Sequence, residues 1–185
     1  MENDFEIKII NQNFLSEDIT EPCSHGPIYL RVKSTVVSDV DDGDWVINEA
    51  ALSLMRTVRY GFPNLEVSPP RYYADGISEE TLINCCGAFM LFCSSSIRWN
   101  VTISEEEVIL DKFIKDEHLE YTDLKVELPL KKYAQIIYDF ALQSFQFFHG
   151  RVITASGWEQ FEGQISEFWN EYTEHMEFIK YKFNL

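Results

Sequence analysis

The chain has 185 residues, of which 45% are hydrophobic and 15% aromatic, so it holds enough apolar material for one buried core. Its 31 acidic residues outnumber 15 basic ones, and the formal net charge is −16. A surplus of this size repels phosphate backbones and anionic membranes, which disfavours nucleic-acid binding and membrane association. We expect a single globular domain over residues 1–185.

The first third of the chain predicts two strands and one helix. Residues 5–9 alternate between apolar and charged side chains, as a half-buried strand does. Residues 28–32 alternate in the same way, and this strand is expected to continue to Val37. After a turn at residues 38–44, apolar side chains recur at helical spacing and predict a helix that ends near Tyr60.

The middle of the chain predicts a long loop and then a strand-rich region. Residues 61–80 contain three prolines and two glycines, which is typical of an irregular surface loop. Apolar or alternating runs predict four strands, of which the middle two form a hairpin. These runs are residues 86–93, 98–103, 108–110 and 124–128.

Two helices are predicted to end the chain. Pro129 suits the start of the first, whose apolar face runs to about His149. A capping box at residues 156–159 begins the second. The order β-β-α-β-β-β-β-α-α lacks a βαβ rhythm, so we predict an α+β fold. Its antiparallel sheet would have about five or six strands, with the three helices packed mainly on one face.

The last predicted helix has an acidic face. Residues 158–179 contain six glutamates and no lysine or arginine. Glu167, Glu171 and Glu174 lie opposite the apolar face, and like charges at that spacing cost about a few tenths of a kcal/mol per pair. One hypothesis is that this face binds a basic partner. The alternative is a solvated face in a generally acidic protein.

A second acidic run, DVDDGD, occupies residues 39–44. It resembles the start of a calcium loop, but Gly43 and Glu49 each fall one position early for the EF-hand pattern. We interpret the run as a turn in which Asp44 or Asn48 caps the following helix. A part in an acidic binding patch remains open for Asp39, Asp41, Asp42 and Asp44.

Cysteine and histidine residues offer little sign of chemistry. The four cysteines are Cys23, Cys85, Cys86 and Cys93. They lack the paired spacing of a zinc site, and we expect free, buried thiols and no metal or other cofactor. Cys23 and His25 can share one face of a strand, but no third orienting residue is evident. Without a catalytic motif the sequence favours a protein that is not an enzyme.

Two adjacent tyrosines in the long loop are further candidates for contact with a partner. Tyr72 and Tyr73 follow Arg71, a composition typical of interface hot spots. The alternative is that these rings fold back on their own domain. The acidic N-terminus has neither the basic nor the apolar region of a signal peptide, so we expect a cytoplasmic protein.

The sequence thus predicts an acidic binding protein that occludes a basic protein partner. In size, acidity and lack of motifs the chain resembles bacterial immunity proteins, which neutralise a basic toxin. That resemblance implies an inhibitory role. The alternative is an enzyme or small-ligand-binding domain with its site under the 61–80 loop. A subunit of a homo-oligomer is a third possibility.

Overall fold

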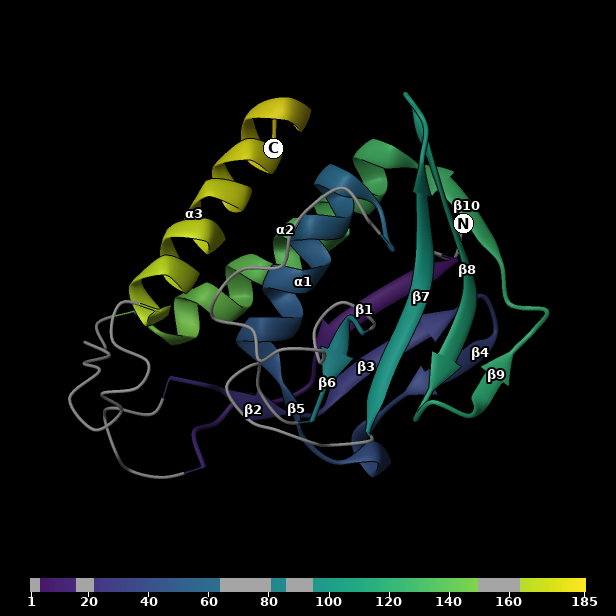
Figure 1. Ribbon diagram of the computed structural model, residues 1–185, viewed down its shortest axis with the longest axis horizontal. Helices are drawn as coiled ribbons and strands as arrows, with labels where there is room; N and C mark the ends of the chain where they lie inside the picture. The colour runs from purple at the N-terminus through teal and green to yellow at the C-terminus, as the bar shows by residue number, and fades with distance from the viewer. Residues whose placement is uncertain (1–3, 16–21, 64–80, 86–94, 150–163) are drawn as a thin grey trace.

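The computed structural model describes residues 4–15, 22–63, 81–85, 95–149 and 164–185 (Figure 1). Its helices are α1 (Ile47–Tyr60), α2 (Leu130–Phe147) and α3 (Gln164–Phe183), with a short 3-10 helix, η1 (Val40–Asp42). Its strands are β1 (Phe5–Ile9), β2 (His25–Gly26), β3 (Ile28–Val32), β4 (Thr35–Ser38), β5 (Trp45–Val46), β6 (Ile83–Asn84), β7 (Ser96–Ile103), β8 (Glu107–Lys115), β9 (Leu119–Tyr121) and β10 (Val126–Pro129).

The strands form three antiparallel sheets. One has the order β1-β3-β4, a second has the order β10-β8-β7-β6 with β9 also beside β8, and β2 pairs with β5. The three helices gather on one side of the two larger sheets (Figure 1). The predicted α+β class is confirmed, but the strands are divided among several sheets instead of forming one.

Aromatic side chains join the two larger sheets to α2 at the centre of the core. The ring of Phe5 in β1 lies 6.0 Å from that of Trp99 in β7 and 5.7 Å from that of Tyr133 in α2. Phe113 in β8 stacks on Trp99 at 5.5 Å. These four rings are almost fully buried, and tilted or offset rings at such distances are favourable pairs. The core therefore sits where both sheets meet the helices.

Two hairpin turns differ from the prediction. The strand expected over residues 28–37 is two strands, because the chain turns at Lys33, whose φ is 53°. The strand expected to end at residue 110 continues to Lys115, and β9 follows a turn with Asp116 and Glu117 at φ 52° and 63°. The strand predicted at residues 86–93 and the capping box at residues 156–159 lie outside the described residues.

Helix α1 is the most enclosed helix segment of the core. Ten of its 14 residues are buried. No side chain caps its first turn, so the predicted cap at Asp44 or Asn48 is wrong. Asn48 Oδ1 instead accepts hydrogen bonds from the Ser24 backbone N–H at 2.9 Å and from its hydroxyl at 3.3 Å. The Ile47 N–H donates to the Ser24 carbonyl at 2.8 Å, which ties the start of α1 to the residue before β2.

Gly61 ends α1 and brings the chain against β7. Its φ is +74°, and a Cβ at this position would lie 2.7 Å from the Val101 carbonyl oxygen. The next residue, Phe62, exchanges two backbone hydrogen bonds with Val101, at 2.9 and 2.8 Å. Both the backbone conformation and the close approach therefore require glycine here.

Gly43 supplies a matched comparison for Gly61. Its φ of +84° is equally unfavourable for other residues, but a Cβ there would meet nothing within 4 Å. We expect Gly43→Ala to lower the free energy of unfolding by about 1–2 kcal/mol and Gly61→Ala by about 3–5 kcal/mol, because only the latter adds a clash. Urea unfolding of both variants measures the difference. Equal losses would show that the Val101 carbonyl moves aside freely.

Candidate binding surfaces

The acidic face of α3 lies against two arginines of α1. The Glu171 carboxylate is 3.4 Å from Arg56 Nε, and the Glu174 carboxylate is 2.7 Å from an Arg59 guanidinium nitrogen. Glu171 is the more enclosed acid, with 23% of its side chain exposed against 66% for Glu174. Ion pairs are stronger where water is partly excluded, so Arg56–Glu171 is the stronger candidate for a stabilising pair.

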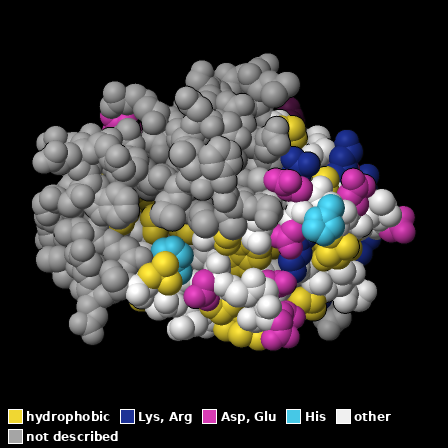
Figure 2. Space-filling view, turned by 60° about the horizontal axis from the view of Figure 1, so that its bottom comes forward, with side chains coloured by type: hydrophobic (Ala, Val, Ile, Leu, Met, Phe, Trp, Pro, Cys, Tyr) yellow, Lys and Arg dark blue, Asp and Glu magenta, His cyan; other side chains and the backbone are white. Residues whose placement is uncertain are grey.

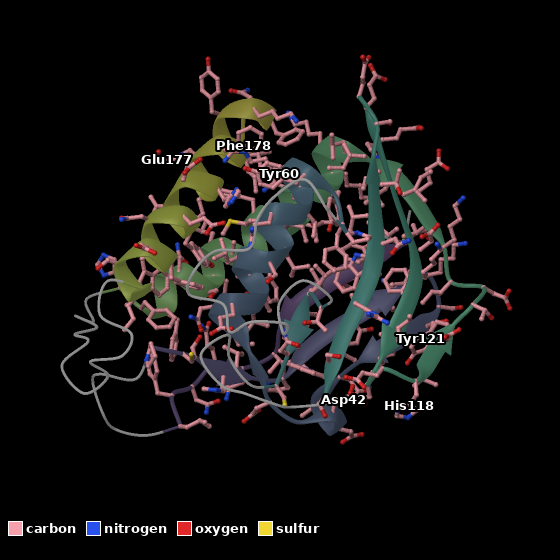
Figure 3. All side chains as sticks on the ribbon, viewed as in Figure 1. Asp42, Tyr60, His118, Tyr121, Glu177 and Phe178 are labelled. Atoms are coloured by element: carbon pink, nitrogen blue, oxygen red, sulfur yellow. The ribbon has the colours of Figure 1, made fainter. Side chains whose placement is uncertain are left out.

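A histidine and two aromatic rings extend the contact between α1 and α3. His175 is buried, with Nε2 3.3 Å from the Glu171 carboxylate and its ring edge-on to Tyr60 at 5.9 Å. The Arg59 guanidinium lies over both Tyr60, at 5.1 Å, and Phe178 of α3, at 4.7 Å. Figure 3 shows Tyr60 and Phe178 at this junction of the two helices.

For Glu171 and Glu174, a basic counterpart exists within the chain. Their charge is balanced by α1, which weakens their pull on a second protein. Glu167, one turn earlier, is half-buried. Contact between these three glutamates and a partner protein stays a prediction.

The acidic run at residues 39–44 forms η1 and its flanks. The Asp39 carboxylate accepts a hydrogen bond from the Asp41 N–H, and the Asp42 carboxylate accepts one from the Asp39 N–H, each at 2.9 Å. This reciprocal pair satisfies free backbone donors at the start of η1. The side chains of Asp41 and Asp44 are exposed.

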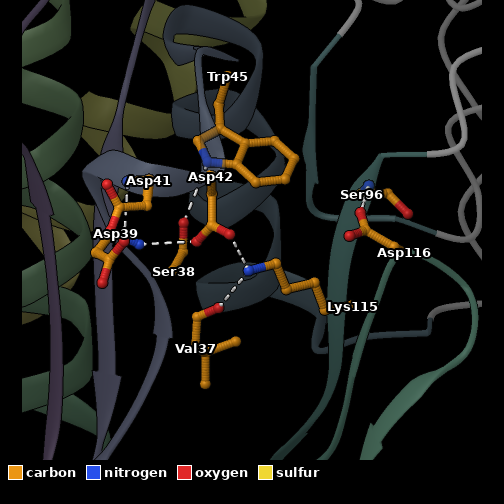
Figure 4. A network of polar contacts seen from close by, with 9 residues as sticks. All are labelled: Val37, Ser38, Asp39, Asp41, Asp42, Trp45, Ser96, Lys115 and Asp116. Atoms are coloured by element: carbon orange, nitrogen blue, oxygen red, sulfur yellow. Dashed lines mark hydrogen bonds and ion pairs between the residues drawn. The ribbon is translucent and has the colours of Figure 1, made fainter.

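Lys115, the last residue of β8, connects this run to the other large sheet. Its ammonium group donates to the Val37 carbonyl of β4 at 3.1 Å and pairs with the Asp42 carboxylate. Figure 4 shows this network. Beside it, the Asp116 carboxylate accepts a hydrogen bond from the Ser96 N–H at 3.2 Å, which fixes the turn after β8. The contact between Lys115 and Asp42 joins residues that are 73 positions apart in the sequence.

The ionisation of Asp42 and Tyr121 reflects this network. Partial burial raises the pKa of the Asp42 carboxyl, but hydrogen bonds from Lys115 and the Asp39 backbone outweigh it, so the net pKa is below its usual value. Burial raises the pKa of the Tyr121 hydroxyl; Lys115 opposes that effect, and Asp42 and Asp116 add to it. Figure 3 shows Asp42, His118 and Tyr121 at the same end of the molecule.

We call this end the acid rim. Its acids are Asp39, Asp41, Asp42, Asp44, Asp116, Glu117 and Glu120. Residues 39–44 and 115–121 contain one lysine, Lys115, and no arginine. Val40 and Leu119, which are 62% and 48% exposed, lie between the acids in sequence. Figure 2 brings this end forward and shows acidic, basic and hydrophobic side chains interspersed on the described part of the face.

The sequence predicted only part of the acid rim. Asp39, Asp41, Asp42 and Asp44 were candidates, and they lie in η1 or beside it. Lys115 and the acids of the β8–β9 turn were missed, because the strand before the turn was predicted to stop at residue 110. A run of charged residues, KDEHLE at 115–120, was the available signal for a turn.

The cysteines are only partly as predicted. Cys23 is a free, buried thiol, but Cys85 is disulfide-bonded, so the expectation of free thiols is wrong for that residue. The Cys23 Sγ donates to the Glu49 carboxylate at 3.5 Å. Glu49 is itself buried in the first turn of α1.

The remaining candidates fall largely outside the described residues. Tyr72, Tyr73 and all but the first three positions of the 61–80 loop lie there, as does the alternative ligand site that the loop would cover. Among the residues that are described, no three histidine, cysteine, aspartate or glutamate side chains are grouped to hold a metal ion.

A pair of carboxyl groups lies near the tip of the β7–β8 hairpin. The hydrogen bond to Glu127 raises the pKa of the Glu107 carboxyl, and the negative charges of Glu127 and Glu106 raise it further. These groups are exposed and have like charge, so they destabilise the folded chain when both are ionised.

Comparison of the chain with protein-family models, curated proteins and solved structures finds no match. None of the described helices is long and apolar enough to cross a membrane.

The two ion pairs between α1 and α3 should differ in strength. We expect a coupling free energy of about 1 kcal/mol for Arg56 and Glu171, and less than about 0.5 kcal/mol for the more exposed Arg59 and Glu174. Double-mutant cycles with Arg56→Met and Glu171→Gln, and with Arg59→Met and Glu174→Gln, measure both by urea unfolding. Coupling near zero in both cycles would mean that the glutamates are effectively free in solution.

The Glu107–Glu127 pair predicts a pH-dependent gain of stability. Because the folded-state pKa of Glu107 is raised, ionisation opposes folding above that pKa and the penalty disappears when the group is protonated. We expect Glu127→Gln to raise Tm at neutral pH and to leave it unchanged below about pH 3.5, where Glu107 is protonated. Glu177→Gln, at an exposed acid on α3, is the control and should give a smaller gain. The same gain in both variants would trace the effect to net charge alone.

Proposed function

We propose that this chain is a non-enzymatic, acidic binding protein that docks a basic protein surface on the acid rim. The observation that carries the proposal is the joining, by Lys115, of two acidic segments, each of which contains one exposed apolar residue, Val40 or Leu119. An inhibitory role, in which the chain occludes its partner as an immunity-type protein does, is the form of this function that we favour.

The charge of the acid rim supports this proposal. Residues 39–44 and 115–121 contain seven acidic side chains and one lysine, and that lysine is already paired with Asp42. Unbalanced carboxylates on one surface attract a positively charged partner and speed its association, and salt screens both effects. In contrast, Arg56 and Arg59 balance two of the acids on α3. We therefore assign Glu167, Glu171 and Glu174 a secondary part.

The exposed apolar residues support the same surface. Charged groups at the edge of an interface mainly govern association rate and specificity, whereas buried apolar contacts at its centre supply most of the affinity. Val40 projects from η1 and Leu119 begins β9, so each acidic segment carries one apolar side chain. A partner with leucine or another large apolar side chain between its basic residues would complement both features.

Charge reversal on the acid rim tests the proposal. The probe is a synthetic peptide in which arginine and leucine alternate, titrated against the full chain by fluorescence anisotropy at low salt. We expect Asp41→Lys with Asp44→Lys to weaken binding at least about tenfold, because both side chains are exposed acids of the rim. Raising NaCl from about 20 mM to about 300 mM should weaken wild-type binding as well.

The matched control reverses Glu105 and Glu106 to lysine at the tip of the β7–β8 hairpin. This pair is also exposed and changes the net charge by the same amount. Its binding should stay close to that of the wild type. Equal losses in the two double variants would attribute binding to net charge, and a wild-type chain that does not bind the probe would refute the proposal.

A further inference from the structure

Lys115 lies at the boundary between the two large sheets. It is the last residue of β8, yet its side chain reaches the Val37 carbonyl of β4, at 3.1 Å, and the Asp42 carboxylate of η1. Only 13% of the side chain is exposed. A lysine usually keeps its ammonium group in water, so this one replaces lost hydration with two protein acceptors (Figure 4).

The contacts of Lys115 fix more than one neighbour. Asp42 also accepts the Asp39 N–H, and Asp39 accepts the Asp41 N–H, so the ammonium group anchors the whole of η1 through Asp42. On the other side, Lys115 is followed directly by Asp116, whose carboxylate holds the Ser96 N–H. The two acidic segments of the rim therefore have Lys115 as their shared connection.

We propose that Lys115 is a positioning residue for the acid rim: it holds residues 39–44 and 116–120 at a fixed spacing so that one basic partner contacts both. This inference rests on the proposed function, because it concerns the same surface. A preorganised surface binds more tightly, since less conformational freedom is lost on association.

The inference predicts a result opposite in sign to that of simple electrostatics. Lys115→Met makes the chain more negative, so charge alone would tighten its binding to the arginine–leucine peptide. If Lys115 positions the rim, binding should instead weaken about fivefold or more. Lys112→Met, at an exposed lysine of the same strand, changes the net charge equally and should leave binding unchanged or tighter. Lys115→Arg, which keeps a cationic donor, should restore most of the affinity.

A second measurement tests, without a ligand, whether Lys115 restrains the backbone of the acid rim. Amide hydrogen exchange of residues 39–44 should be faster in Lys115→Met than in the wild type, whereas exchange in the paired segment 108–110 of β8 should not change. Circular dichroism checks that the variant is folded; if it is not, Lys115→Gln takes its place.

The outcomes separate the inference from the proposed function. Tighter peptide binding by Lys115→Met, or unchanged exchange at residues 39–44, would overturn the positioning role while the charge-reversal result still stands. A wild-type chain that fails to bind the peptide would refute the proposed function, and the positioning role in binding with it.

Discussion

The burial of α1 is the constraint on which the rest of the structure depends. Sheets and helices enclose most of this helix, and its last two arginines emerge only where α3 crosses it. A cation close to a core must be paired or reach water. The glutamates of α3 meet that need for Arg56 and Arg59, because a lysine at position 171 or 174 would repel them.

This pairing changes the meaning of the net charge. A count of −16 treats every carboxylate alike, but the structure separates acids balanced by arginines from acids that are not. The balanced ones help to hold α3 on α1. Those of the acid rim have one lysine among seven acids, and their field extends into solvent, where it can act on another molecule. The acidic face of α3 and the acidic run at residues 39–44 therefore differ in how strongly they can attract a partner.

Periodicity predicted the elements whose pattern is local, such as β1, α1, α2 and the β7–β8 hairpin. It failed at two turns, near Lys33 and at Asp116–Glu117, for one reason. Both turns have left-handed residues that are not glycine or asparagine, so the usual turn signal is missing. It also could not predict Arg59–Glu174, because those residues are 115 positions apart and meet only after the helices pack.

The turn after β8 has acidic residues at two positions whose backbone conformation favours glycine. Asp116 and Glu117 both occupy the left-handed region, which costs side chains other than glycine roughly 1 kcal/mol each. The Ser96 N–H offsets part of that cost at Asp116, while Glu117 is exposed. Glycine would suit this conformation better but would remove a carboxylate from the rim. If the acid rim binds a basic partner as we propose, binding and not stability accounts for acids at these two positions.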